Sequence, residues 1–90
     1  MISVEFTNVL KNFFPTLTPQ QVEADNLSGV LSQINSAFPG LSDYLVDETG
    51  NFREHISVYL DDEPLPPGVS ANQTVKEGQR VFFFQAISGG

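Results

Sequence analysis

The stretch DNLSGVLSQINSAFPG, residues 25–40, decides the fold. Its apolar residues recur at the three- and four-residue intervals that place them on one face of a helix: Leu27, Val30, Leu31, Ile34 and Phe38. Asp25-Asn26 supplies an N-cap, and Pro39-Gly40 ends the helix. The sequence therefore predicts one main amphipathic helix, whose apolar face needs another element to cover it.

Two strands are predicted before this helix. Ile2, Val4 and Phe6 alternate with polar residues, which indicates a half-buried first strand. Residues 20–24 form a short second strand in which Val22 faces inward. Residues 8–19 are expected to be a loop or irregular connection, because prolines interrupt any regular element there.

Further strands are predicted after the helix. Residues 41–45 are expected to add a short helical turn, and the alternating residues 56–60 form the clearest strand in the chain. Asp61-Asp62 provides a turn, and residues 64–73 indicate an irregular crossing segment because they contain three prolines and a glycine. Residues 80–86 form the final strand.

The order of these elements predicts an α+β fold. One helix can cover only one face of a sheet, and here it crosses from an initial pair of strands to the later strands. The simplest closure is the β-grasp fold, with a mixed sheet of about four to five strands and the main helix on one face. We expect residues 1–90 to be a single domain with a flexible C-terminal tail over residues 87–90.

The composition of the chain argues against several classes of partner and site. The formal net charge of −7 disfavours nucleic acid and membrane partners and favours a basic protein partner. Cysteine is absent, and with a lone His55 no metal site is expected. There is neither a long apolar run nor a signal peptide, so the expected location is the cytoplasm. Without cysteine, a second histidine or a glycine-rich phosphate-binding motif, the chain is not expected to be an enzyme by itself.

The final strand contains the run Val81-Phe82-Phe83-Phe84, which places aromatic rings on both faces of the sheet. If Phe83 enters the core, Phe82 and Phe84 lie on the face that the helix leaves uncovered. They would then form an apolar partner-docking patch, joined by Tyr59. The alternative is that the segment 64–73 folds over them.

After the last strand come Ile87, Ser88, Gly89 and Gly90. A cloning scar or a frayed end would also produce such a sequence. A Gly-Gly tail, however, has no Cβ atoms and can enter a narrow active site in an extended form. This suits a terminal carboxylate that attacks the α-phosphate of ATP and is then attacked as an acyl-adenylate.

These features together resemble the MoaD/ThiS family of ubiquitin-like sulfur carriers over nearly the whole chain. FPGL at residues 38–41 resembles the family's Tyr/Phe-Pro-Gly-Leu, and FREHISVYLDDE at residues 52–63 resembles its Leu-Arg-x-His-Val-x-Val-Phe-Val-Asn-Gly-Glu pattern. VKEGQRV at residues 75–81 resembles Val-x-Asp-Gly-Asp-x-Val. AISGG at residues 86–90 resembles the closing Ala-Val-Ala-Gly-Gly.

The resemblance implies a chemistry and a set of partners. An E1-like adenylating enzyme would use ATP to adenylate Gly90, and a sulfur donor of the rhodanese or cysteine desulfurase type would convert it to a thiocarboxylate. The acceptor would be an enzyme such as a cysteine synthase or the large subunit of molybdopterin synthase. The carrier itself would hold no cofactor, although in a molybdopterin synthase it would count as the small subunit.

Two other classes remain open. A protein modifier would use the same activated Gly90 to form an isopeptide bond with a target lysine. A plain β-grasp interaction domain would not need its terminal glycines.

Overall fold

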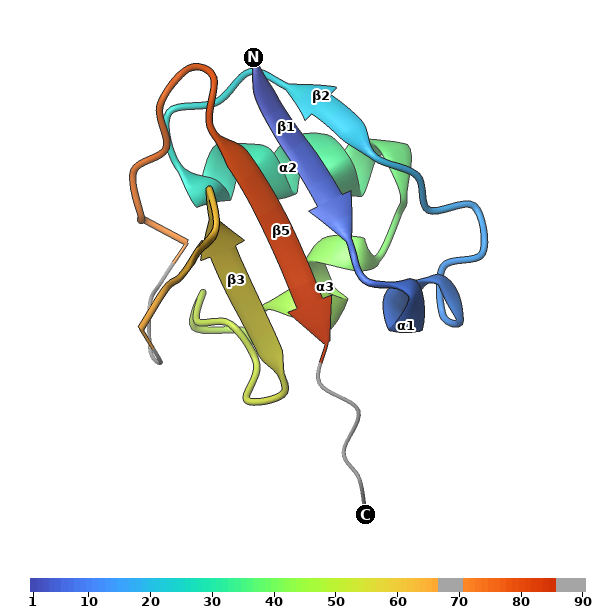
Figure 1. Ribbon diagram of the computed structural model, residues 1–90. Helices are drawn as coiled ribbons and strands as arrows, with labels where there is room; N and C mark the ends of the chain where they lie inside the picture. The colour runs from blue at the N-terminus through green and yellow to red at the C-terminus, as the bar shows by residue number, and fades with distance from the viewer. Residues whose placement is uncertain (67–70, 86–90) are drawn as a thin grey trace.

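The computed structural model describes residues 1–66 and 71–85, so Ile87, Ser88, Gly89 and Gly90, with the predicted tail, lie outside the described residues. The described strands are β1 (Ile2–Phe6), β2 (Gln20–Val22), β3 (Ile56–Leu60), β4 (Glu63–Pro64) and β5 (Arg80–Gln85). The described helices are α1 (Asn8–Lys11), α2 (Leu27–Ala37) and α3 (Leu41–Leu45). The strands form one sheet in the order β2-β1-β5-β3-β4. Figure 1 shows β2, β1, β5 and β3 side by side in this order.

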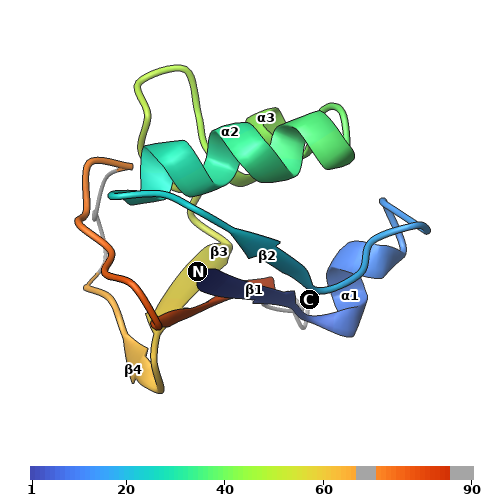
Figure 2. The same ribbon diagram turned by 90° about the horizontal axis from the view of Figure 1, so that it is seen from above.

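The sheet is mixed, as predicted. β1 and β5 pair in parallel, from Ser3 opposite Arg80 to Phe6 opposite Phe83, and the other neighbouring strands pair antiparallel. α2 and α3 lie together against one face of this sheet (Figure 2). The predicted α+β, β-grasp fold with the main helix on one face is therefore confirmed.

α2 forms where the sequence predicts it. The side chain of Asn26 accepts a hydrogen bond from the backbone N–H of Gly29 at 2.8 Å, which is the expected N-cap contact. The helix ends at Ala37, and Gly40 then takes a left-handed conformation with φ of 93°. Every residue of the predicted apolar stripe is buried: Leu27, Val30, Leu31, Ile34 and Phe38.

One hydrophobic core lies between the helices and the sheet. The inward residues of β1 and β5 are buried at its centre, and the rings of Phe6 and Phe83 stack there with centroids 5.9 Å apart. Val22, the predicted inward residue of β2, is also buried. Within the described residues, none of the helices has the length and apolar character needed to span a bilayer.

The structure differs from the sequence prediction at three places. α1 lies in the predicted loop, because Leu10 is fully buried and pins one helical turn against the core. β2 ends at Val22, before the predicted end at residue 24. The segment expected to be irregular from residue 64 begins with Pro64 in strand β4, which pairs with the end of β3.

Candidate functional site

The sheet face opposite α2 and α3 carries aromatic residues that are exposed or only partly buried. Along β5, Val81 and Phe83 point into the core, whereas Phe82 and Phe84 project from the opposite face. On β3, Tyr59 lies directly across from Phe82 and projects to the same side. The structure therefore confirms the predicted alternation, in which Phe83 enters the core and Phe82 and Phe84 lie on the opposite face.

These three rings contact one another, and we call them the open-face aromatic cluster. The ring centroid of Tyr59 lies 6.3 Å from that of Phe82 and 6.3 Å from that of Phe84. The centroids of Phe82 and Phe84 lie 6.5 Å apart. Phe84 is 38% exposed, and the other two are partly buried. Leu65 and Ala71, from the segment 64–73 that could have covered this cluster, pack against the core, and residues 67–70 of that segment lie outside the described residues.

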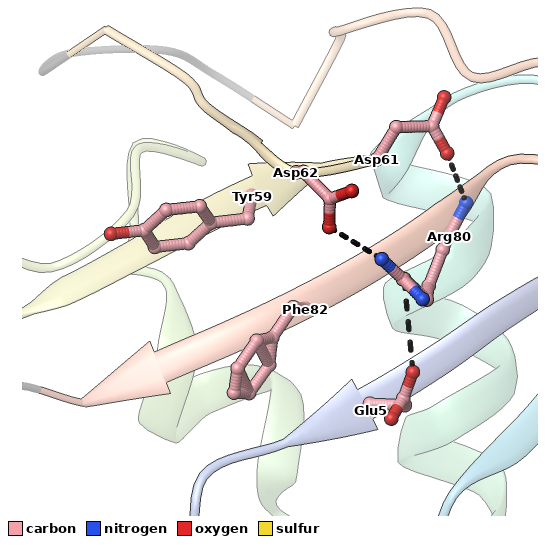
Figure 3. Close-up of a pocket in the computed structure, with 6 residues that line it drawn as sticks. All are labelled: Glu5, Tyr59, Asp61, Asp62, Arg80 and Phe82. Carbon is pink, nitrogen blue, oxygen red and sulfur yellow. Dashed lines mark hydrogen bonds and ion pairs between the residues drawn. The ribbon is translucent and has the colours of Figure 1, made fainter.

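A shallow cleft of about 330 Å³ opens beside the cluster (Figure 3). Its lining combines two aromatic rings with four charged side chains: Glu5, Tyr59, Asp61, Asp62, Arg80 and Phe82. Three carboxylates against one guanidinium give the lining a formal charge of −2. The cleft therefore favours a cationic group on any partner that fills it.

Arg80 interacts with all three acidic residues of this lining. Its guanidinium pairs with Asp62 and lies 3.9 Å from the carboxylate of Glu5 (Figure 3). Its backbone N–H donates to Oδ1 of Asp61 at 2.9 Å, and the side chain of Gln79 donates to Oδ2 of Asp61 at 3.3 Å. The Asp61-Asp62 turn, where Asp61 has a φ of 53°, is thus attached to the start of β5.

β5 ends at Gln85, two residues before the predicted tail over residues 87–90. Gln85 is the last described residue, and its side chain accepts a hydrogen bond from the hydroxyl of Tyr44. His55 is exposed, and its ring lies edge-on to that of Tyr44. Within residues 1–66 and 71–85, no three His, Asp or Glu side chains converge as metal ligands would.

The sequence comparison identifies the family. The model of the ThiS family matches residues 6–90, which includes both terminal glycines. The chain belongs to the ThiS family. No curated protein matches this ThiS-family chain in sequence.

Solved structures show the same fold. CysO of Amycolatopsis orientalis, in a complex with BexX, superposes with a TM-score of 0.84 at 20% identity over 100% of both chains. Small archaeal modifier protein 1 of Methanosarcina acetivorans has a TM-score of 0.74 at 15% identity, over 99% of this chain and 95% of that one. A complex of subunits 1 and 2 of molybdopterin-converting factor from Helicobacter pylori contains a chain with a TM-score of 0.61 at 17% identity. The match covers 99% of this chain and 97% of that one.

The structure brings together part of the predicted site. Tyr59, Phe82 and Phe84 meet as expected, whereas Arg80 and the two aspartates beside them had been predicted only as strand and turn residues. Their placement beside the aromatic rings follows from the β3–β5 pairing, which opposes Leu60 to Val81 and brings the turn back to β5. A charged residue next to outward-facing aromatic residues on the same strand is the sequence signal from which Arg80 could have been predicted as part of the site.

Proposed function

We propose that this chain is a sulfur carrier protein that acts through the carboxylate of Gly90. The supporting observation is the ThiS-family match, which runs through residue 90 and therefore covers the Gly89-Gly90 pair. The carrier is not an enzyme by itself, because activation and transfer take place in the active sites of other proteins. It works in the cytoplasm, where ATP is available to the activating enzyme.

The chemistry proceeds in two steps. One carboxylate oxygen of Gly90 attacks the α-phosphate of ATP in an E1-like enzyme, and pyrophosphate leaves. A persulfide of the sulfur donor then attacks the acyl carbon and AMP leaves. Reductive cleavage of the acyl disulfide by a thiol leaves the thiocarboxylate. The complete absence of cysteine is no obstacle, because the sulfur is carried on the chain's own carboxyl carbon.

We propose that the activating enzyme docks on the open-face aromatic cluster. An aromatic group of this kind, with charges at its rim, is typical of the centre of a protein interface. The adjacent cleft, with its formal charge of −2, favours a lysine or arginine of the partner. The net charge of −7 would also speed the encounter with a basic surface.

The acceptor belongs to one of two kinds of enzyme. Structural similarity to CysO supports a cysteine-synthase-type acceptor, and similarity to a chain of the molybdopterin-converting factor supports the large subunit of a molybdopterin synthase. The donor would be of the rhodanese or cysteine desulfurase type. The carrier needs no bound cofactor of its own.

Intact-mass analysis of the protein purified from its own cells tests the proposal. A thiocarboxylate at Gly90 increases the mass by the difference between one sulfur and one oxygen, and hydrolysis removes this difference. The same spectrum shows whether the mature chain ends at Gly90. A chain that ends there and carries only the carboxylate, while the pathway is active, would contradict the proposal.

A second candidate is a ubiquitin-like modifier. The structural similarity to small archaeal modifier protein 1 favours it. In that case Gly90 would be joined to target lysines, and an immunoblot would show high-mass conjugates that disappear when Gly90 is removed. A plain interaction domain would keep all its activities without Gly89 and Gly90.

A further inference from the structure

Three segments meet at the C-terminal end of β5. The hydroxyl of Tyr44, on α3, donates a hydrogen bond to Oε1 of Gln85 at 2.9 Å. The backbone N–H of Gln85 donates to Oγ1 of Thr7, between β1 and α1, at 3.3 Å. Gln85 is thus held through both its side chain and its backbone, although it stands at the last position of the strand.

Thr7 extends the parallel ladder by an unusual route. Its N–H donates to the carbonyl of Phe83 at 3.1 Å, so a regular ladder would next join the N–H of Gln85 to the carbonyl of Thr7. That carbonyl instead accepts from the N–H of Leu10, in the first turn of α1. The hydroxyl of Thr7 takes its place toward Gln85. β5 therefore stays hydrogen-bonded to Thr7 at Gln85, although the chain at Thr7 has already turned from β1 into α1.

Tyr44 is held in place by rings. Its ring centroid lies 5.2 Å from that of Phe13, 5.6 Å from that of Phe14 and 6.4 Å from that of His55. A phenylalanine at position 44 could make the same ring contacts, so packing alone does not require the hydroxyl. Because the surrounding rings already restrict the side chain, the hydrogen bond to Gln85 costs little additional rotamer entropy.

We propose that Tyr44 is a positioning residue, which together with Thr7 fixes the end of β5 and so directs Gly90 into the active site of the activating enzyme. This inference rests on the proposed function. Gly90 is five residues beyond Gln85, a reach of at most about 17 Å in an extended chain. Any freedom at Gln85 would spread the position of the reacting carboxylate, and misplacement of a reacting group lowers the rate of the chemical step.

The two hydrogen bonds that Thr7 and Tyr44 make with Gln85, which we call the clamp, also link docking to chemistry. Phe84 belongs to the open-face aromatic cluster, and Gln85 follows it directly. An enzyme that binds Phe84 therefore meets a tail that starts from a fixed point. Loss of the clamp should leave the docking surface intact and impair only the step in which the carboxylate reacts.

Tyr44→Phe is the first test, because it removes the hydroxyl and keeps the ring. Pyrophosphate release from ATP is followed with the activating enzyme at increasing concentrations of the carrier. We expect kcat to fall by about fivefold or more while KM stays within about twofold. Gln85→Leu should behave in the same way. Gln85→Glu retains an acceptor for the Tyr44 hydroxyl and should keep kcat near that of the unaltered chain.

A matched control is Gln33→Leu, which removes a side-chain hydrogen bond from α2 to the carbonyl of Glu23. This bond lies away from the end of β5, so both kinetic constants should stay unchanged. Equal values of kcat for Tyr44→Phe and the unaltered chain would overturn the proposal.

A second measurement does not depend on any enzyme. The NMR order parameter of the Gln85 amide should be close to that of a rigid backbone, about 0.85, and should fall toward about 0.6 in Tyr44→Phe. An unchanged order parameter would overturn the clamp. If the unaltered chain is not adenylated at all, the proposed function fails, and the order parameter alone decides whether Tyr44 fixes Gln85.

Discussion

Phe83 and Phe84 are consecutive residues of β5 that face opposite sides of the sheet. Phe83 is 0% exposed and stacks on Phe6, whereas Phe84 is 38% exposed and contacts Tyr59. A shift of one residue in the pairing of β5 would exchange their environments. The two residues therefore separate the contribution of this strand to stability from its contribution to binding.

Substitution of these two residues should have opposite consequences. Phe83→Ala should destabilise the fold by about 3–5 kcal/mol, because it truncates a core ring. Phe84→Ala should change the melting temperature little and weaken the complex with the activating enzyme by about 2 kcal/mol or more. Thermal melts and titrations of both variants measure these effects. Equal destabilisation with unchanged binding would contradict the docking role of the open-face aromatic cluster.

Ile34→Ala tests the packing of α2. Ile34 is fully buried against the sheet, and its truncation should lower the free energy of unfolding by about 2–5 kcal/mol. Urea denaturation measures the loss, and Ser36→Ala, at an exposed position of the same helix, is the control. A loss below about 1 kcal/mol for Ile34→Ala would show that the side chain contributes little to the core.

Addition of one residue after Gly90 should abolish thiocarboxylate formation and leave the fold unchanged. The reacting group is proposed to be the carboxylate of Gly90, and an added residue converts it to an amide. Intact mass and circular dichroism report the two properties separately. Proteolytic removal of the added residue should restore activity. Thiocarboxylate on an extended chain that has not been trimmed would show that the reacting group is misassigned.

Asp47 should make the turn after α3 sensitive to acid. Its carboxylate accepts hydrogen bonds from the hydroxyl of Thr49 at 2.6 Å and from the backbone N–H groups of Thr49 and Asn51 at 2.9 and 3.2 Å. The Thr49 hydroxyl is the main cause of a lowered pKa for Asp47, and the backbone donors add to it. The pKa is thus lower in the folded chain than in the unfolded chain, where it is about 3.9.

The resulting stabilisation is complete above the unfolded pKa and is lost as the pH falls through the lowered, folded pKa. An NMR titration of the Asp47 carboxyl and the Thr49 amide should show this transition. Asp47→Asn is the control, because its amide oxygen still accepts these bonds but does not titrate. A midpoint for Asp47 at or above the ordinary aspartate value would contradict the assignment.

The sequence predicts α2 well and α1 not at all, for a physical reason. α2 has an N-cap at Asn26, a long apolar stripe and a stop at Gly40, all of which are local signals. α1 is four residues long, its N-cap Thr7 makes no side-chain capping bond, and it depends on the burial of Leu10. Such a short helix exists because of tertiary packing, which no local pattern reports.

The same distinction applies to the candidate site. The open-face aromatic cluster follows from alternation along two strands, so Phe82, Phe84 and Tyr59 could be predicted from their positions. The bond between Tyr44 and Gln85 joins residues 41 positions apart and depends on how α3 docks beside the end of β5. Neither residue belongs to a motif that indicates its partner.

The parallel pairing of β1 with β5 has a consequence for the order of events during synthesis. The two central strands of the sheet come from opposite ends of the chain, with Ser3 opposite Arg80. On the ribosome, β1 has no partner on that side until the segment up to residue 85 has emerged, and contacts between residues so far apart in sequence form slowly. The exposed edge of β1 would meanwhile be open to chaperones or to other nascent chains. The pairing of β1 with β5 can form only after translation has passed β5, so a product that stalls or ends before β5 would lack the centre of the sheet and would not fold.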